Sequence, residues 1–485
     1  MTQAAHPHLD IAVVGHTNVG KTSLLRTLTR RRDFGTVDDN PGTTRHVETI
    51  DLNLDGAPAV RYCDTPGLED AAALQHYLKN LPGEGTPVER VRSFLAGPEA
   101  HAAFEQEAKV LRTMLAVDAA IYVIDCREDV LPKYRYEIEI LSACGKPVMP
   151  VLNFSRSPHS QHAAWRETLA AYHLHASVQF DAVAPFTGAE RQLYQDLGVL
   201  LSARRGQLQA IIDALELQAQ DRRQAATQIA ASVLVSAAAM RREIDKDAAA
   251  DAPRKAALVR DFKASLAAQV QRAVQDMLAV YGFGPGDADL ALAPWTAGRW
   301  EADLFNPQTL VDAGQKLGTG AAVGAAVGLV ADVALAGLSL GAATALGAAV
   351  GGLASQGWSQ VPRKLANRLR GTEELTLEDG VLLLLAASLL RLCRALEQRG
   401  HAALETLHGS ADPTDPTDPT DLSVDSGALP AAARLVASLA PARSHPEWER
   451  AAKAGSWFPA DASDHADSRR TRLVRSAAEQ LRAAL

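Results

Sequence analysis

The feature that most constrains the fold is a short stretch near the beginning of the sequence, where an apolar run passes into a loop bounded by glycines. Ile11–Val14 are apolar and mostly β-branched, as in a buried strand. Gly15–Thr22 fit the pattern G-x-x-x-x-G-K-[ST] at every fixed position, and Ser23–Leu28 continue as a helix. The glycines let successive backbone N–H groups point inward, where they and the helix N-terminus can hold phosphates. The stretch therefore predicts a P-loop that binds a nucleotide.

Individual roles follow from the chemistry of that loop. Lys21 is expected to reach the β- and γ-phosphates, and the hydroxyl of Thr22 is expected to ligate magnesium. Backbone N–H groups of the loop supply the other phosphate contacts. The predicted nucleotide-binding residues of the loop are Gly15, Asn18, Val19, Gly20, Lys21, Thr22 and Ser23.

Length and charge limit what else the chain contains. Its 485 residues exceed a single hydrophobic core, and a chain of that size is expected to hold about two to four domains. A net charge of -8 gives no general attraction for nucleic acid, and no nucleic-acid partner is predicted. Residues 1–10 contain no apolar run, so no secretory signal peptide is expected. The cysteines show neither C-x-x-C spacing nor a disulfide framework, which favours a reducing compartment without a zinc site.

A second phosphate-sensing element follows a predicted hairpin. His46–Leu54 alternate in polarity, Asp55-Gly56 predict a turn, and a second run of strand-forming residues ends at Asp64. Asp64–Gly67 read D-x-x-G. An aspartate at a strand end can hold magnesium through water, and Gly67 can offer the γ-phosphate a backbone N–H on a mobile loop. The box lies downstream of the P-loop with a threonine-rich segment, residues 41–45, between them, and this order strengthens the assignment.

These motifs resemble those of translation-factor-type small GTPases of the Era and TrmE-like group. The resemblance rests on Gly15–Thr22, on Pro41–Arg45 (Pro-Gly-Thr-Thr-Arg) and on Asp64–Gly67, and it covers residues 8–205. It implies an α/β P-loop NTPase G domain, in which a mostly parallel sheet carries helices on both faces. It also implies that GTP or GDP and magnesium bind there, and it leaves open a homodimer of G domains.

The same resemblance implies a catalytic set and a metal site. Thr44 is implied to be the switch threonine that closes on magnesium when the γ-phosphate is present. Lys21, Thr44 and Gly67 form the implied catalytic set. Thr22, Thr44 and Asp64 are the implied metal ligands.

The motifs do not identify which residue positions the attacking water or which residue stabilises the charge of the transition state. Leu68 stands where some GTPases carry a water-orienting glutamine, so this position offers no direct catalysis. Asn18 matches the P-loop asparagine that helps to bind potassium in potassium-stimulated relatives; the alternative is that it only braces the loop. Arg90 or Arg92, in a long insert after the D-x-x-G box, are candidates for a stabilising charge, and a solvated helix face is the alternative.

The nucleobase site is predicted at the end of a further buried strand. Here the resembled family carries N-K-x-D, whose aspartate accepts hydrogen bonds from guanine and so excludes adenine. Asn153 is retained, Phe154 replaces the lysine and can stack on a base, and Arg156 occupies the acid position. An arginine has no acceptor, so the choice between guanine and adenine stays open. Asp181-Ala182 are interpreted as a degenerate form of the family's last base-contacting box, Ser-Ala.

The second half is predicted to be largely α-helical. Ala, Leu, Gln and Arg dominate residues 202–246 and 254–281 and favour long helices, and residues 371–400 predict another. Repeated Asp-Pro-Thr triplets are typical of a disordered linker. This half resembles an uncharacterised α-helical domain fused behind such G domains in proteobacteria. The predicted domains are a G domain (1–205), a helical domain (206–408) that includes an apolar segment (317–361), a linker (409–427) and C-terminal helices (428–485).

The apolar segment has two readings. Residues 317–361 hold one charged residue, Asp332, and glycines four residues apart, a spacing that lets helices pack closely in lipid. Basic residues flank the segment up to Arg370. One reading is a Gly/Ala-rich hairpin that inserts in a membrane and places residues 317–370 on an anionic surface. The other is a buried helical pair in a soluble domain.

The function predicted from sequence is a GTP-binding and GTP-hydrolysing molecular switch. Its nucleotide state controls the helical domain, and the protein is cytoplasmic or associates with the inner membrane. Two alternatives stay open. One is an ATPase with the same phosphate site, which Arg156 supports. The other is a membrane scaffold that binds nucleotide with negligible turnover.

Overall fold

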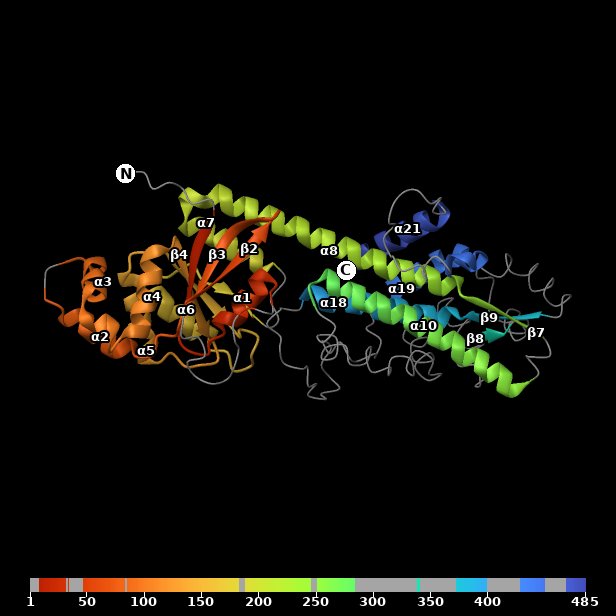
Figure 1. Cartoon of the computed structure of the whole chain (residues 1–485), viewed down its shortest axis with the longest axis horizontal. Coiled ribbons are helices and arrows are strands. Elements are labelled where there is room, and N and C mark those ends of the chain that lie inside the picture. Colours follow the sequence, from red (N-terminus) through yellow and green to blue (C-terminus); the bar gives the residue numbers. More distant parts are fainter. Residues whose placement is uncertain are drawn as a thin grey trace. The chain divides into compact units, whose positions relative to one another are not determined.

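The computed structural model describes residues 8–31, 34, 47–82, 85–182, 188–245, 251–283, 338–340, 372–398, 428–449 and 468–485. The chain divides into two compact units. Unit 1 comprises residues 1–219 and 398–404, and unit 2 comprises residues 220–397 and 405–485. The division falls inside the long helix α8 (Arg205–Ala239), drawn in yellow-green in Figure 1. The boundary predicted at residue 205 is the first residue of this helix.

The described part of unit 1 is built on a six-stranded sheet in the order β2-β3-β1-β4-β5-β6. β2 is antiparallel to β3, and the other neighbouring strands are parallel. The predicted mostly parallel sheet is confirmed. The strands are β1 (Leu9–Val14), β2 (Glu48–Leu54), β3 (Ala57–Asp64), β4 (Ala119–Asp125), β5 (Val148–Asn153) and β6 (Val178–Gln179).

Helices cover both faces of this sheet, as predicted. Side chains of β1 alternate between two buried clusters: Ile11 and Val13 belong to one, Ala12 and Val14 to the other. The first cluster is closed by α1, α7 and the first part of α8, and the second by α2 to α6. The helices are α1 (Lys21–Thr29), α2 (Ala71–Asn80), α3 (Pro87–Ala96), α4 (Glu105–Ala116), α5 (Pro132–Ala143), α6 (His162–Ala171) and α7 (Ala189–Leu200), with short 3-10 helices at Pro98–His101 and Ser202–Arg204.

The hairpin between β2 and β3 confirms the prediction made from its turn residues. Asp55 and Gly56 have φ values of 51° and 80°. Two successive positive φ angles suit a tight two-residue turn between twisted antiparallel strands. The hairpin sets the end of β3, and therefore Asp64, beside β1.

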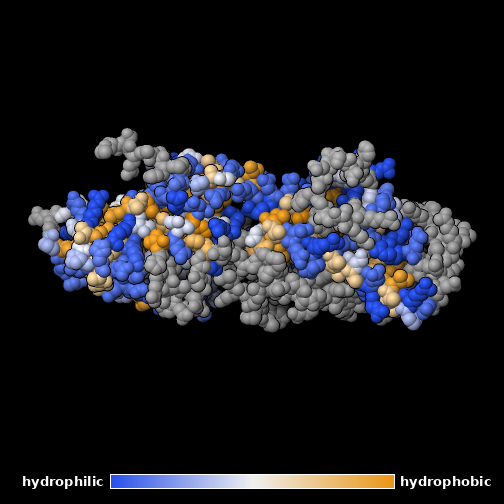
Figure 2. Space-filling view, viewed as in Figure 1, coloured by the Kyte–Doolittle hydropathy of each residue, from blue (hydrophilic) through white to orange (hydrophobic). Residues whose placement is uncertain are grey.

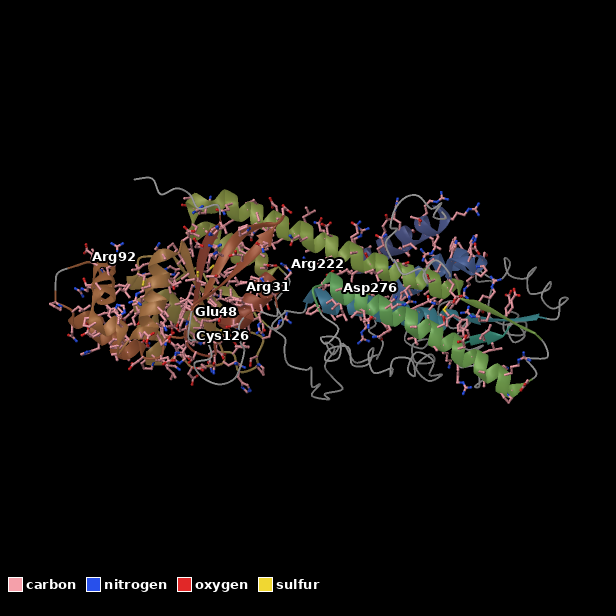
Figure 3. The ribbon with its side chains drawn as sticks, in the orientation of Figure 1. Arg31, Glu48, Arg92, Cys126, Arg222 and Asp276 are labelled. Carbon is pink, nitrogen blue, oxygen red and sulfur yellow. The ribbon has the colours of Figure 1, made fainter. Side chains whose placement is uncertain are left out.

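The insert that follows the D-x-x-G box contains α3, a short 3-10 helix and α4. α3 begins with a capping box: the Thr86 hydroxyl accepts from the Glu89 backbone N–H, and the Glu89 carboxylate accepts from that of Thr86. Figure 3 shows Arg92 on α3, well apart from Arg31, which lies beside α1. Arg92 is exposed, in line with the solvated-face reading.

The described part of unit 2 is mainly helical, as predicted. One buried cluster joins the second part of α8 to the other helices of the unit, with Phe262, Leu385 and Trp448 among its members. Ala and Leu make up most of the cluster. The other helices are α10 (Ala252–Val280), α18 (Asp379–Gln398), α19 (Ala428–Ser438) and α21 (Ser468–Ala484), with a 3-10 helix at Ala440–Ser444.

Two helix predictions in unit 2 are wrong at their ends. The helix expected over 202–246 stops at Ala239, and Arg241–Asp245 form strand β7. The helix expected over 371–400 begins at Asp379, after strand β9 (Thr372–Leu377). β7 pairs antiparallel with β9, and β9 with β8 (Leu338–Leu340). These strands form because their backbone groups bond to partners far away in sequence, which local helix propensity does not report.

Several predictions fall outside the described residues. They include the switch segment 41–45, the Asp-Pro-Thr linker at 409–427, and the apolar segment 317–361 except for Leu338–Leu340, which form strand β8. Within the described ranges, no helix combines the length and apolar character needed to cross a membrane. The face drawn in Figure 2 mixes hydrophilic and hydrophobic residues. Large exposed hydrophobic side chains in the described ranges are Leu131, Val199 and Leu217.

Candidate functional site

The loop between β1 and α1 has the backbone shape that a phosphate cradle needs. Gly15, Asn18 and Gly20 have φ values of 146°, 61° and 89°. A Cβ atom on Gly15 would lie 2.5 Å from the carbonyl oxygen of Val123, and one on Gly20 would lie 2.5 Å from Nδ2 of Asn153. Both positions therefore exclude larger residues through their conformation and through space.

Lys21 closes the cradle from the first turn of α1. Its Nζ donates to the carbonyl oxygens of Gly15 at 3.3 Å and His16 at 2.7 Å, and its side chain is buried. Burial lowers the pKa of Lys21, while the nearby charges of Asp64 and Glu137 oppose that shift. The ammonium group is thus folded over the loop carbonyls, at the place where phosphate oxygens would compete for it.

Thr22 and Asp64 form the part of the site that suits a divalent cation. The Thr22 hydroxyl donates to Oδ2 of Asp64 at 2.6 Å. Oδ1 of Asp64 is buried and has no hydrogen-bond partner in the described structure, and burial raises the pKa of this carboxyl. An unpartnered buried carboxylate oxygen beside a hydroxyl is the donor chemistry that magnesium prefers. These two residues therefore fit a magnesium ion.

The D-x-x-G segment lies directly on the P-loop. Thr65 holds its beginning, because both its backbone N–H and its hydroxyl donate to the carbonyl of Val13, at 3.3 and 2.8 Å. Gly67 lies so close to Thr17 that a Cβ atom on it would be 2.5 Å from the Thr17 methyl carbon. A glycine is therefore required at this contact, which places Gly67 next to the cradle.

The end of the same segment is fixed by buried groups. Leu68 is fully buried, and its carbonyl faces the ring of His16 at 3.1 Å. The Glu107 carboxylate of α4 accepts from the backbone N–H groups of Glu69 and Asp70, at 3.2 and 3.0 Å. The insert after the D-x-x-G box therefore anchors the segment that is expected to move with the nucleotide.

Asn153 ties three loops together at the predicted nucleobase site. Its Nδ2 donates to the carbonyl of Val19 at 2.9 Å. Its Oδ1 accepts from the backbone N–H groups of Phe154 and Ala182, each at 3.0 Å. Ala182 is held from its other side by the hydroxyl of Thr27, which donates to its carbonyl at 2.7 Å. The P-loop, the end of β5 and the loop after β6 thus meet at one side chain.

An aromatic and a cationic group line the same region. The Arg127 guanidinium lies over the Phe154 ring, 3.8 Å from its centroid, and binds the Asp125 carboxylate through Nε and Nη2. The pKa of Arg127 is raised, first by its hydrogen bonds to Asp125, and the charge of Asp181 adds to this effect. Phe154 adopts a φ of 55°, and its ring approaches Gly20. Position 156, where the resembled family carries an acid, is an arginine.

The sequence-predicted residues therefore come together in the described structure, except for Thr44, which lies outside it. Val19 is buried and Ser23 is half-buried beside the loop. Sequence reasoning did not find His16, Glu137, Arg127 or Glu107, which contact or flank the loops of the site. His16 occupies a variable position of the P-loop pattern, and the others come from helices or loops that carry no motif.

The geometry defines a P-loop nucleotide-binding domain with a cation site and a switch segment, joined to a helical unit. Residues 10–154 match the family model of the 50S ribosome-binding GTPases, and residues 166–464 match the family described as Domain of unknown function (DUF3482). The N-terminal domain is therefore of the GTPase class, and the resemblance inferred from its motifs is confirmed. The chain as a whole belongs to the DUF3482 family, whose model covers more than half of it.

Curated GTP-binding proteins are similar to about a quarter to a third of this chain. A probable GTP-binding protein EngB of Anaeromyxobacter dehalogenans is 29% identical over 143 residues, which are 26% of this chain and 63% of that protein. GTPase Der of Mesorhizobium japonicum is 31% identical over 156 residues, which are 31% of this chain and 26% of Der. Among solved structures, Aquifex aeolicus Era bound to GDP·AlF4⁻ is 20% identical, with a TM-score of 0.27, covering 36% of this chain and 52% of Era. The chain spans less than two thirds of each of these proteins.

Proposed function

We propose that the protein is a molecular switch that binds and hydrolyses GTP, and that its nucleotide state controls unit 2. The observation that carries the proposal is the buried Asp64 oxygen without a partner, beside Thr22 and Lys21, under a loop shaped for phosphates. A buried carboxylate oxygen without a hydrogen-bond partner costs free energy. A bound magnesium ion would give this oxygen a partner.

The chain's own residues can carry out most of the work of phosphoryl transfer. The loop N–H groups and Lys21 bind and orient the phosphates, and Gly67 offers its N–H to the γ-phosphate. Thr22 and Asp64 would hold magnesium, which supplies positive charge against the charge that develops on the phosphate oxygens. Because Leu68 is buried and apolar, its side chain cannot orient the attacking water, and backbone groups or potassium beside Asn18 are proposed for that role.

Guanine is the proposed base. Asn153 holds the P-loop and Ala182 together at the predicted nucleobase site, and the N-terminal domain belongs to the GTPase class. A phosphate site alone does not distinguish guanine from adenine, so the base must be tested separately. Arg156 in the acid position favours the ATPase alternative.

Calorimetric titration of the full-length protein with GDP and with ADP tests the proposal, followed by phosphate release from GTP and ATP. We expect GDP to bind at least about a hundredfold more tightly than ADP, as hydrogen-bonded base recognition allows. Equal affinity, or tighter ADP binding, would establish the ATPase alternative. Tight GDP binding with no phosphate release would establish the scaffold alternative. Arg61→Gln, at an exposed ion pair with Asp51, is the matched control because it lies outside the cradle.

The membrane part of the prediction concerns residues that the structure does not describe, and it stays a prediction. Cosedimentation of the full-length protein with neutral and with anionic vesicles tests it, at low and high salt. Binding that needs anionic lipid and weakens with salt would support the basic flank of residues 317–370 as the contact. Asp332→Asn should strengthen the binding of an inserted hairpin, because a carboxylate inside lipid costs about 2.5–3.5 kcal/mol.

A further inference from the structure

His16 is the P-loop residue whose side chain leaves the loop toward α5. Its Nδ1 lies 2.8 Å from Oε1 of Glu137 and 3.1 Å from the carbonyl oxygen of Leu68. Its Nε2 lies 3.1 Å from Nζ of Lys133, and its ring packs edge-on against Tyr134. The imidazole therefore contacts the D-x-x-G segment and a helix that no motif of the sequence pointed to.

The partners of His16 determine its tautomer. An ammonium group can only donate a hydrogen bond, so Nε2 must accept from Lys133. In that arrangement the Nδ1 atom carries the N–H that is donated. A carbonyl and a carboxylate can only accept, and both face this single N–H, the Leu68 oxygen and Oε1 of Glu137. One donor is thus shared between two acceptors.

Glu137 is a fixed acceptor. Its side chain is fully buried, and its Oε2 accepts from the Tyr122 hydroxyl at 2.8 Å. Its charge also acts on Lys21, where it opposes the effect of burial. The carboxylate therefore stays in place whether or not His16 also bonds to Leu68, and it belongs to the electrostatic surroundings of the phosphate site.

Three described contacts hold the backbone of residues 65–70. Thr65 is tied to β1 and residues 69–70 are tied to Glu107 of α4, so both ends of the segment rest on the scaffold. The third contact is Leu68 to His16, and it adjoins Gly67. Among the three, it joins the segment to the P-loop itself, and its donor has a second acceptor within reach.

We propose that His16 is a positioning residue that sets the free energy needed to move Gly67. When the Leu68 carbonyl leaves, the Nδ1–H is retained by Glu137, so no buried donor is left unpaired. When it returns, the N–H is shared again. The movement of Gly67 therefore costs little free energy and is reversible. Helix α5 takes part in it through Glu137. This inference deepens the proposed function and rests on it.

The test uses two substitutions that separate the ring nitrogens. In His16→Asn the amide nitrogen occupies about the place of Nδ1, and in His16→Gln it occupies about the place of Nε2. His16→Gln should therefore lose the contact to Leu68, and His16→Asn should restore it. The control is His76→Gln on α2, an exposed histidine in the same unit that contacts Asn80.

The first measurement is hydrogen–deuterium exchange of residues 65–70 in the nucleotide-free, full-length protein, which does not depend on GTP hydrolysis. In His16→Gln this peptide should exchange about tenfold faster, the loss expected for one hydrogen bond. His16→Asn and His76→Gln should exchange like the wild type. Unchanged exchange in His16→Gln, or equal acceleration in both His16 variants, would overturn the inference.

The second measurement is turnover of GTP. His16→Gln should lower kcat about tenfold while KM and GDP affinity stay within about threefold, because the phosphate cradle is a backbone structure. His16→Asn should recover kcat. A loss of GDP affinity in both variants would show a merely structural role and overturn the inference. If the wild type does not hydrolyse GTP, the proposed function fails, and exchange still decides the role of His16.

Glu137→Gln provides a second variant for the exchange measurement. Because its amide is a weaker second acceptor for the His16 N–H, the peptide of residues 65–70 should exchange more slowly. Faster exchange would contradict the inference.

Discussion

Two buried carboxylates, Asp64 of unit 1 and Glu449 of unit 2, differ in how their oxygens are hydrogen-bonded. Asp64 of unit 1 is 1% exposed; one of its oxygens accepts from Thr22 and the other has no partner in the described structure. Glu449 of unit 2 is 4% exposed, and both of its oxygens accept from the guanidinium of Arg242, at 2.7 and 2.8 Å. The Glu449 carboxylate is therefore fully paired within the protein, whereas Asp64 keeps one oxygen that a bound cation could use.

The same contrast holds for the cations. Arg242 is fixed in a two-bond pair, which stabilises one conformation. Within the described ranges, Lys21 donates to carbonyl oxygens of its own loop, and burial lowers its pKa. Polar groups at a site are kept incompletely paired because their partners arrive with the ligand, whereas structural polar groups are paired on folding. The contrast therefore assigns function to unit 1 and scaffold to the Arg242 pair.

The largest effect is expected at Lys21. Lys21→Ala should reduce GTP and GDP affinity at least about a hundredfold, because charge-assisted bonds to the phosphates are lost. Calorimetry measures the affinity. Calorimetric unfolding without nucleotide should still show a cooperative transition, because the hydrogen bonds that are lost, to the carbonyls of Gly15 and His16, lie within one loop. Unchanged affinity in a folded variant would remove the site assignment and end the contrast between the units.

A substitution at the buried ion pair of unit 2 tests the other side of the comparison. Glu449→Gln should destabilise unit 2 by about 2 kcal/mol, because Arg242 loses its charged partner in a half-buried position. Scanning calorimetry separates the units, since GDP raises the transition of the unit that binds it. GDP affinity should be unchanged. Asp51→Asn, at the exposed pair with Arg61, is the control, with an expected change within about 0.5 kcal/mol. A fall in GDP affinity in Glu449→Gln would contradict the division of roles.

A smaller effect is expected from the monovalent cation. If Asn18 helps to bind potassium, exchanging sodium for potassium should raise kcat by about threefold or more, and Asn18→Ala should remove the increase. GDP affinity should change little. Phosphate release in matched sodium and potassium buffers measures this. Equal rates in both salts would leave Asn18 as a brace of the loop, which its φ of 61° also suits.

The smallest effect concerns pH and unit 2. Burial, with a contribution from Asp379, raises the pKa of Glu378 from 4.5 to about 7. The folded state therefore binds the proton more tightly than the unfolded state. The stability that this contributes is complete below pH 4.5 and is lost as the pH rises through about 7. Glu378→Gln should flatten this decline in the unit 2 transition, measured by calorimetry between pH 5 and about 8. An unchanged slope would show that the group is more exposed in solution.

The sequence predicted elements best where local pattern and final environment agree. The β2–β3 hairpin follows from its alternation and its Asp55-Gly56 turn, and the P-loop strand and helix follow from one motif. Strands β7 and β9 were missed, because their pairing joins Arg241–Asp245 to Thr372–Leu377 across a long separation in sequence. The residues around these strands favour helices, so the short alternating run of β9 was not recognised as a strand. In this run Leu375 and Leu377 are buried.

The sequence by itself determined the class of the N-terminal domain, and it predicted the residues that would hold phosphate and magnesium. These residues lie in two contiguous motifs, whose spacing fixes loop shape through local backbone sterics. Tertiary structure alone decided what those motifs touch: the ring of His16 against Glu137 and Leu68, Glu107 on the switch segment, and Arg127 over Phe154. The physical reason is that a hydrogen bond or a stacked ring depends on distance in space. Separation along the chain says nothing about it until the sheet has brought β1, β3, β4 and β5 side by side.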